Sequence, residues 1–480
     1  MKEGEGMRIL GLVSGLDVDT LVSQLMSIER RPLNQLEERK SSYELKKELW
    51  QDINTSLVSL KGSMDTLAAQ SVYDSKKMII GDQSVLTATY DSTAAISKYE
   101  VNITALAKFL TITSDRQTDI NAALGLSGTF NIGDGTKTST PISISATDSL
   151  TSIMNKINVA TDASGNRINV EASIVDNKLI LKGVTANDNI VITNDTNGIF
   201  VSLGVLNPDL TFKNKLNDAS LGSMTINGLT VNFAQNSELR NIIPGVTLNL
   251  LKVGSTTLEI QKDVDAVVNA VKDFINKYNS LMDLVNQRLS EKPIENPAND
   301  SERKIGLLRG DFNLISIKDS LRRMISDPVS GLTTYDELAK VGITTESTDF
   351  GKSGKLVLDE TKLRDALTKN PDAVYQLFTQ NKDVNGNGKI ETSEMGIAKR
   401  LQNYIDFLTG FSSGIITKKL SSFDTIINDY NKRIEDMEKR LDEIEKRYYR
   451  QFTQMERALS TMRNQSNWLY GQLSNWFNNE

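Results

Sequence analysis

The sequence contains neither cysteine nor histidine, and these two absences exclude several classes of function. Without cysteine there are no disulfides, no thiolate metal ligands and no cysteine nucleophile. Without histidine the chain lacks the commonest zinc ligand and the usual general base near neutral pH. A Ser–His–Asp triad is therefore impossible. Carboxylate and lysine chemistry stay open, but the composition argues against an enzyme.

Long apolar runs and an excess of positive charge are missing as well. No stretch of about 18 apolar residues occurs, so we expect no membrane span. The net charge is −6, and Lys and Arg alternate with Asp and Glu, which argues against a nucleic-acid partner. Glu3 and Glu5 precede the short apolar stretch Met7–Leu16, where a secretory signal would carry positive charge. We expect no cleaved signal peptide, which leaves a cytoplasmic protein or one exported with its N-terminus intact.

The N-terminal part of the chain has the periodicity of helices. Asp17 is a good N-cap residue, and Leu21, Leu25 and Ile28 form one apolar face of the helix that follows. Pro32 is expected to interrupt this helix. A second helical segment carries a heptad-like stripe made of Leu36, Tyr43, Trp50, Ile53, Leu57, Leu60, Met64 and Leu67.

A matching stripe near the C-terminus extends over residues 422–473. A continuous helix of that length would measure about 75 Å at 1.5 Å per residue. The stripe consists of Ile427, Tyr430, Ile434, Met437, Leu441, Ile444, Tyr448, Phe452, Met455, Leu459 and Met462. Two such stripes at opposite ends of one chain are expected to pair, most simply as an antiparallel coiled coil.

Antiparallel pairing would bring both termini to one end of a rod, with apolar side chains from each. The candidate partner-binding residues there are Leu12, Leu16, Leu21, Leu25 and Ile28 from the first helix and Trp468, Tyr470, Trp476 and Phe477 from the last. These side chains either pack inside the rod or, as exposed aromatic groups often do, contact a neighbouring subunit.

The middle of the chain has the period of β-strands, and the pattern becomes helical again at residues 263–289. We therefore predict an α+β multidomain fold with antiparallel coiled-coil legs, a helical base and two β-rich head domains, one inserted in the other. The predicted parts are legs formed by 1–72 with 400–480, a β domain of 73–113 and 216–262, an inserted β-rich domain of 114–215, and a helical base of 263–399.

One motif carries metal chemistry, and it lies between two helical stretches. Asp383–Glu394 reads DVNGNGKIETSE, which fits the calcium-loop pattern D-x-[DN]-x-[DN]-G-x5-E. The predicted ligands of a structural calcium ion are Asp383, Asn385, Asn387, the backbone carbonyl of Lys389, Glu391 and Glu394. The same residues also suit a hydrophilic turn without a metal, since only three carboxylates are available and no second loop is present to pair with this one.

Several blocks of the chain resemble the flagellar filament cap protein family, also called hook-associated protein 2. They are GLVSGLDVDTLVSQLMSIERRPLNQLEERK at Gly11–Lys40, INGLTVNFAQNSELRNIIPGVTLNLL at Ile226–Leu251, the blocks Leu308–Gly331 and Leu338–Phe378, and a stretch at Asp148–Gly183 similar to a motif of flagellin and hook proteins. The resemblance covers most of the chain and is weakest in 114–215 outside that motif.

This resemblance implies a structural protein of the bacterial flagellum and no enzyme. Members of the family leave the cell unfolded through the flagellar export channel and form a ring, often of five subunits, at the distal filament tip. The implied partners are further copies of the same chain, flagellin, the hook–filament junction proteins and a cytoplasmic export chaperone. Flagellin subunits fold and insert beneath such a cap.

Three other functions stay open from the residues. A surface adhesin would act through the Ser-, Thr-, Asn- and Gly-rich insert 114–215. Another axial component, such as flagellin or a junction protein, would also have paired terminal helices, but it would lack the GLDVDTLV and IIPGVTLNL segments found here. A carboxylate-based hydrolase would need two carboxylates at a suitable spacing in one cleft, and the sequence gives no convincing pair.

Overall fold

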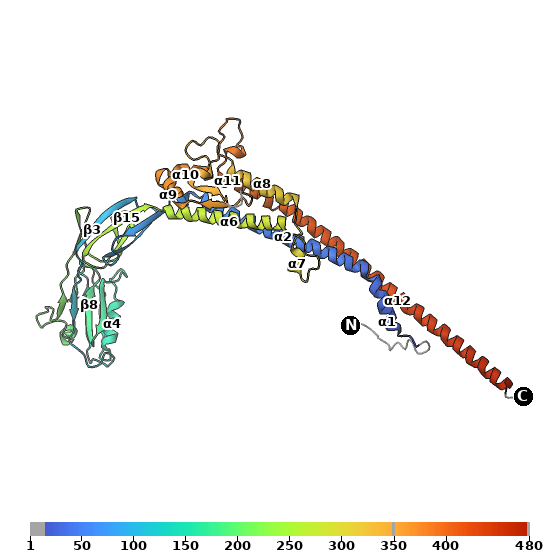
Figure 1. Ribbon diagram of the computed structural model, residues 1–480. Coiled ribbons are helices and arrows are strands. Elements are labelled where there is room, and N and C mark those ends of the chain that lie inside the picture. The colour runs from blue at the N-terminus through green and yellow to red at the C-terminus, as the bar shows by residue number, and fades with distance from the viewer. Residues whose placement is uncertain (1–14, 348–350, 478–480) are drawn as a thin grey trace. The chain divides into compact units, whose positions relative to one another are not determined.

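The computed structural model describes residues 15–347 and 351–477, with the side chains of 475–477 excepted (Figure 1). Two units can be distinguished. The helical unit comprises Met1–Tyr73 and Val264–Glu480, and the β unit comprises Asp74–Asp263. The predicted α+β multidomain class is confirmed, with helices at both ends of the chain and antiparallel sheets between them.

The N-terminal helices begin and end where local sequence signals place them. The carboxylate of Asp17 accepts a hydrogen bond from the backbone N–H of Thr20 (3.0 Å) and so caps α1 (Val18–Glu29). The longer α2 (Arg31–Leu67) follows after one residue. Pro32 lies in its first turn, where the missing N–H would have no partner inside the helix, so the proline starts α2 without disrupting it.

The remaining helices of this unit pack on α2 or on one another. They are α3 (Gln70–Tyr73), α6 (Val264–Ser290), α7 (Asp300–Lys304), α8 (Phe312–Ser326), α9 (Glu360–Lys369), α10 (Pro371–Thr379), α11 (Ile397–Thr409) and α12 (Ile415–Phe477), with a hairpin of β16 (Ile343–Thr345) and β17 (Leu356–Leu358). Side chains of α2, α6, α8, α11 and α12 share one buried core. α12 has 63 residues and begins before the predicted start at 422.

Trp50 lies buried at the point where three of these helices meet. The ammonium of Lys419 on α12 lies 4.1 Å from the centroid of the Trp50 ring, a cation–π contact. The same ammonium is 2.9 Å from the carboxylate of Asp311, which in turn caps α8 by accepting the N–H groups of Asn313 and Leu314. One aromatic ring and one ion pair thus tie α2, α8 and α12 together.

We predict that Trp50→Ala lowers the free energy of unfolding of the helical unit by about 3–5 kcal/mol, because it removes a fully buried ring and leaves a cavity. Hydrogen exchange of the full chain, followed by mass spectrometry, would measure the loss of protection in α2, α8 and α12. The control is Val58→Ala on the same helix, where the side chain is 49% exposed and little should change. Equal protection in both variants would contradict this role of Trp50.

The β unit begins with two antiparallel sheets that share one core. The five-stranded sheet has the order β1-β15-β3-β11-β12 and the three-stranded sheet the order β13-β14-β2. The strands are β1 (Lys76–Ile80), β2 (Leu86–Tyr90), β3 (Ser97–Ala105), β11 (Gly222–Ile226), β12 (Leu229–Phe233), β13 (Leu239–Ile243), β14 (Val246–Leu250) and β15 (Gly254–Lys262). Strands from both sides of the insert therefore build one domain.

Two tight turns connect neighbouring strands of this domain. The stretch 223–233 is a hairpin, because Asn227 and Gly228 have φ of 48° and 85° and form the turn between β11 and β12. The strand β13 was not predicted. It pairs with β14 across a turn at Pro244–Gly245, where Gly245 has φ 73°, as a type II turn requires.

The insert has its own core and its own sheets. These are a four-stranded sheet, β10-β4-β8-β7, and a three-stranded sheet, β6-β5-β9, with two short helices. The elements are β4 (Thr111–Thr113), β5 (Gly128–Gly133), β6 (Ile142–Ile144), α4 (Leu150–Asn158), β7 (Val170–Val175), β8 (Lys178–Gly183), β9 (Val191–Thr193), α5 (Ile199–Ser202) and β10 (Lys215–Asn217). Lys108 and Ser220 exchange two backbone hydrogen bonds (2.9 and 3.0 Å) where the chain enters and leaves this insert.

Candidate functional site: the paired terminal helices

The two ends of the chain lie side by side in antiparallel register, as predicted (Figure 1). Contacts that fix this register are Tyr43 with Tyr430 (ring centroids 5.8 Å apart), Lys47 with Asp424, and Lys61 with Asp406 (2.7 Å). Residues later in α2 contact residues earlier in the C-terminal part, first in α12 and then in α11, so the two segments run antiparallel. An apolar stripe from each end of the chain is buried in this contact, as in a coiled coil.

Nearer the N-terminus, α1 packs on a later part of α12. The small cluster there contains Val18, Val22 and Met26 from α1, Leu33 from the start of α2, and Leu441 and Ile444 from α12. At its rim the hydroxyl of Tyr448 donates to the Glu29 carboxylate (3.1 Å), and the hydroxyl of Tyr449 donates to the Asp19 carboxylate (3.0 Å). The hydrogen bond to Glu29 raises the pKa of the Tyr448 hydroxyl, so this tyrosine stays a donor through the physiological range.

The apolar face expected on α1 from its leucine and isoleucine spacing is not the face that packs on α12. Val18, Val22 and Met26, each four residues apart, point toward α12, whereas Leu25 and Ile28 are 36% and 56% exposed. Leu21 is half-buried between the two faces. The helix carries apolar residues on two sides, and the pattern of leucines alone does not reveal which side meets the partner helix. The consequence is that α1 keeps an apolar face in solvent.

The last part of α12 extends beyond the residues that α1 covers. The most C-terminal member of the shared cluster is Phe452, and Met462, predicted to belong to the pairing stripe, is 64% exposed. Trp468 and Tyr470, both predicted partner-binding residues, are 65% and 72% exposed. Leu469 and Leu473 also face solvent and were missed, although their spacing of four residues beside Trp468 signals one helix face.

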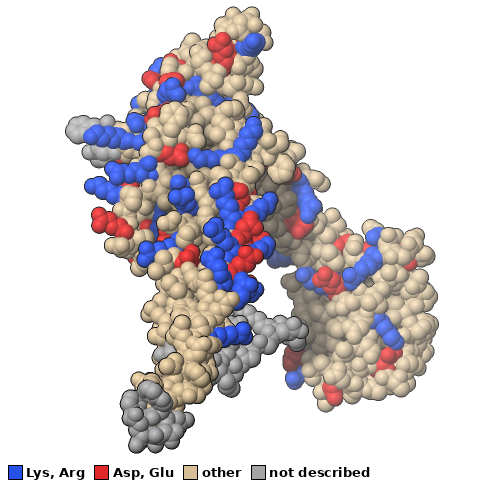
Figure 2. Space-filling view, turned by 90° about the vertical axis from the view of Figure 1, so that its right-hand side faces the viewer, with Lys and Arg blue, Asp and Glu red and all other residues tan. Residues whose placement is uncertain are grey.

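We call these side chains the terminal apolar face. It consists of Leu16 just before α1, Leu25 and Ile28 from α1, and Met462, Trp468, Leu469, Tyr470 and Leu473 from α12. Residues 464–477 contain no Asp, Glu, Lys or Arg, and the surface next to the lowest group of grey atoms in Figure 2 carries no red or blue. The predicted residue Leu12 and the side chains of Trp476 and Phe477 lie outside the described part of the chain.

An uncharged helix face with several exposed aromatic and aliphatic side chains has the composition of a protein–protein contact. The two sets of residues come from helices held by the same cluster, but Trp468 and its neighbours lie beyond the section that α1 contacts. The structure therefore leaves these apolar side chains exposed to solvent. Over the described residues, no helix is both long and apolar enough to cross a bilayer.

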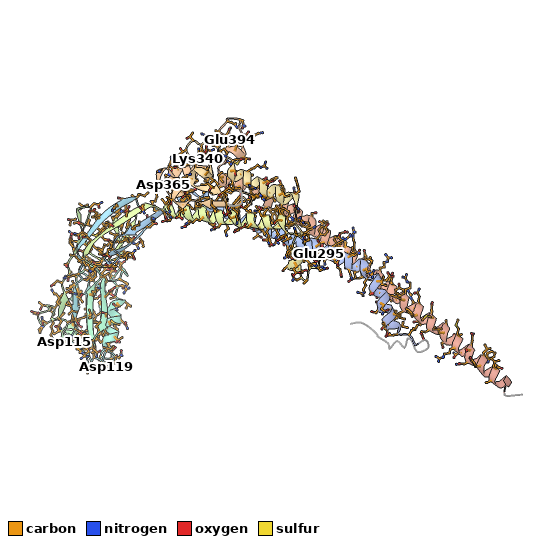
Figure 3. All side chains as sticks on the ribbon, in the orientation of Figure 1. Asp115, Asp119, Glu295, Lys340, Asp365 and Glu394 are labelled. Carbon is orange, nitrogen blue, oxygen red and sulfur yellow. The ribbon has the colours of Figure 1, made fainter. Side chains whose placement is uncertain are left out.

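The six predicted calcium ligands all lie in the single loop between α10 and α11, and Glu394 ends a short 3-10 helix there (Figure 3). The Asp383 carboxylate accepts the N–H groups of Gly386 (2.7 Å) and Gly388 (2.7 Å). Glu394 is 2% exposed. Within the described residues no three Asp, Glu, His or Cys side chains form a metal-binding group by themselves, so a metal here would also need amide and carbonyl oxygens.

Comparison with known proteins places this architecture among flagellar proteins. The fold is similar to the D1–D2–D3 domains of the flagellar cap protein FliD of Escherichia coli, with a TM-score of 0.50 and 24% identity, covering 78% of this chain and 99% of that one. Two family models match: the C-terminal model of flagellar hook-associated protein 2 at residues 219–464 and the N-terminal model at residues 14–109. The chain belongs to the flagellar hook-associated protein 2 family.

Relatives of full length support the same assignment. Flagellar hook-associated protein 2 of Escherichia coli K12 is 27% identical, covering 97% of this chain and 98% of the relative. The protein of the same name from Halalkalibacterium halodurans is 24% identical, and the match covers 98% of this chain and 100% of the relative. The resemblance seen in the sequence is confirmed.

The two faces of α1 give a prediction that separates folding from partner binding. Val22→Asp places a charge in the buried cluster and should release α1, so hydrogen exchange in α1 and in residues 437–452 of α12 should rise by at least about tenfold. Leu25→Asp places the same charge on the exposed face and should leave exchange unchanged. If Leu25→Asp also frees α1, or Val22→Asp does not, the assignment of the two faces is incorrect.

Proposed function

We propose that this protein caps the distal end of the flagellar filament and promotes the insertion of exported flagellin at the growing tip. Membership of the hook-associated protein 2 family supports a cap role. The terminal apolar face is the observation that carries the mechanism, because it gives the paired helices a surface on which to dock. No catalytic group is required for such a role, since positioning and sheltering a folding subunit needs surfaces only.

In this proposal the paired helices act as legs that bind the filament subunits under the cap. A helix that exposes an apolar stripe on a long unpaired end is suited to pack against other helices, as in a helix-in-groove contact. Flagellin and the hook–filament junction proteins are the proposed partners of these legs. Further copies of the chain complete a ring at the tip, with five subunits as the expected number.

Export fits the same proposal. Because the chain has no cysteine, no disulfide can lock it before it passes through a narrow channel. Before export the uncovered end of α12 would expose Trp468, Leu469 and Tyr470 to the cytoplasm, where such a stretch favours association. We propose that a cytoplasmic chaperone covers this end until export, and that the folded protein then resides at the filament tip outside the cell.

Complementation tests the cap role. In a strain whose gene for this protein is deleted, the unaltered chain should restore filaments, while flagellin should accumulate as monomer in the medium without it. A chain with Leu25→Asp and Trp468→Ala should fold but leave most flagellin unpolymerised, because the legs lose apolar contacts at both helices. Electron microscopy of filaments and quantification of flagellin in the medium would measure this.

The matched control is Val159→Asp, which adds the same charge at a 73% exposed site of the insert, a part of the chain that contributes no residue to the legs. It should restore filaments fully. Normal filaments from the Leu25→Asp/Trp468→Ala chain would refute the leg mechanism. Filaments of normal length in the deletion strain itself would refute the cap role as well.

The adhesin alternative rests on the insert alone and can be separated from the cap role. The insert has its own core, and its entry and exit are held together by the Lys108–Ser220 hydrogen bonds. Removing residues 110–218 and joining the ends by two glycines should therefore leave the rest of the β unit folded. In the same complementation strain this chain restores filaments if the protein is a cap only, and adhesion of the cells changes if the insert is also an adhesin.

A further inference from the structure

We propose that the loop Asp383–Glu394 binds one calcium ion, and that the ion fastens the junction between α10 and α11. The relevant observations are a complete twelve-residue ligand pattern and a buried carboxylate that has no cation partner. This inference is independent of the cap role, since its observations concern one loop of this chain only.

The ligand pattern places an oxygen at each position that a calcium loop uses. Asp383, Asn385 and Asn387 occupy the first, third and fifth positions, and Glu394 occupies the twelfth. Gly388 stands at the sixth position with φ 79°, the left-handed conformation that the sharp turn of such a loop requires. A solvated Asn-Gly turn needs the glycines, but it does not need a glutamate at the twelfth position.

Glu394 is the residue that closes the loop. Its Oε1 accepts the N–H groups of Val384 and Asn385 (both 3.0 Å), and its Oε2 accepts the N–H of Glu391 (2.9 Å). The carboxylate therefore sits against the start of the loop, directly beside Asp383 and Asn385. The side chain is 2% exposed, so its charge lies away from water.

A buried carboxylate is strongly unfavourable unless a positive charge compensates it. Among the ion pairs of the described residues, none involves Glu394. The buried cation nearest in sequence, Arg400, donates instead to the backbone carbonyls of Met395 and Asp327 (2.9 and 2.8 Å). By contrast, the sheltered carboxylate of Asp311 is paired with Lys419. Three backbone N–H groups thus hold the buried carboxylate of Glu394, and a bound cation would add the positive charge that no side chain supplies among the described ion pairs.

The donor set favours calcium over other metals. All candidate donors are oxygens, from carboxylates, side-chain amides and one backbone carbonyl, and hard oxygen ligands in six or seven positions suit calcium. Zinc is disfavoured because the sequence has neither cysteine nor histidine. With three carboxylates in one unpaired loop, we expect a dissociation constant of about 10⁻⁴–10⁻³ M, which extracellular calcium would satisfy.

The loop is tied to the core in a way that would transmit the effect of the ion. The side-chain amide of Gln380, at the end of α10, donates to the carbonyls of Ser330 and Glu394 (both 2.8 Å). The backbone N–H of Ser330 donates to the carbonyl of Ser393 (2.7 Å), and the N–H of Gly396 donates to the carbonyl of Gln380 (2.7 Å). An ion that holds Glu394 in place therefore also holds the start of α11, and local opening of this junction should become rarer.

Isothermal titration calorimetry of the full chain with calcium chloride tests the site. The unaltered chain should bind one ion, Asp383→Asn should bind at least about tenfold more weakly, and Asn387→Asp should bind more tightly because it adds a fourth carboxylate. Asp365→Asn removes an exposed carboxylate from α9, outside the loop, and should bind like the unaltered chain. Hydrogen exchange of residues 380–396 should slow when calcium is added, and this slowing should be absent in Asp383→Asn.

The two loop variants distinguish a loss of calcium binding from a loss of fold. Asp383→Asn loses hydrogen bonds inside the loop, but Asn387→Asp makes the opposite prediction: a less protected loop without calcium and a better protected one with it. Absence of binding heat up to about 10 mM calcium would overturn the proposal. Equal heats from all four chains would also overturn it, since they would show calcium binding elsewhere on an acidic surface.

Discussion

The antiparallel contact between the two ends of the chain is the constraint on which the rest of the helical unit depends. α2 and α12 are separated by several hundred residues of sequence, yet Trp50, Tyr43 and their partners bury one continuous apolar surface between them. Burial of this kind stabilises by roughly 25 cal/mol for each Å² of apolar surface removed from water. Neither helix could bury its stripe alone, so each end of the chain requires the other.

This arrangement makes the chain a set of nested insertions. The two ends of the β unit meet where the N–H of Asp263 donates to the carbonyl of Ser75 (2.8 Å). The two ends of the insert meet at the hydrogen-bonded pair Lys108 and Ser220. Closing these long loops costs conformational entropy that grows only slowly with length, so an inserted domain is tolerated once its ends meet. The helical unit, however, cannot form before α12 is available. A chain exported from its N-terminus would therefore complete this unit last.

The sequence alone predicts the large elements well, because helix and strand periods are explicit in it. The pairing of the two helical stripes, the helix 263–289 and the β-rich character of the insert correspond to observed elements. The capping residue Asp17 and the position of Pro32 are local signals, and both appear where local rules place them. The family resemblance gives the flagellar assignment independently of these patterns.

What the sequence did not predict depends on packing between distant segments. α1 is apolar on two sides, and only the position of α12 decides that Val22 is buried and Leu25 exposed. Met462 continues the heptad stripe but is exposed, and among the described residues the cluster shared with α1 ends at Phe452. β13 was missed because strand pairing across the Pro244–Gly245 turn supplies its stability, although that turn is readable in the sequence. For the calcium loop, the sequence supplies the ligand types, and the burial of Glu394 is visible only in three dimensions.

Cross-linking of paired cysteines tests the central claim most directly, since the natural chain contains no cysteine to interfere. The account predicts rapid cross-linking by a short bifunctional maleimide in a chain with Lys47→Cys and Asp424→Cys, and in a second chain with Asp19→Cys and Tyr449→Cys. The exchanged pairs, Lys47→Cys with Tyr449→Cys and Asp19→Cys with Asp424→Cys, should not react within one molecule. Cross-linking of the exchanged pairs, or of none, would contradict the antiparallel contact between the chain ends.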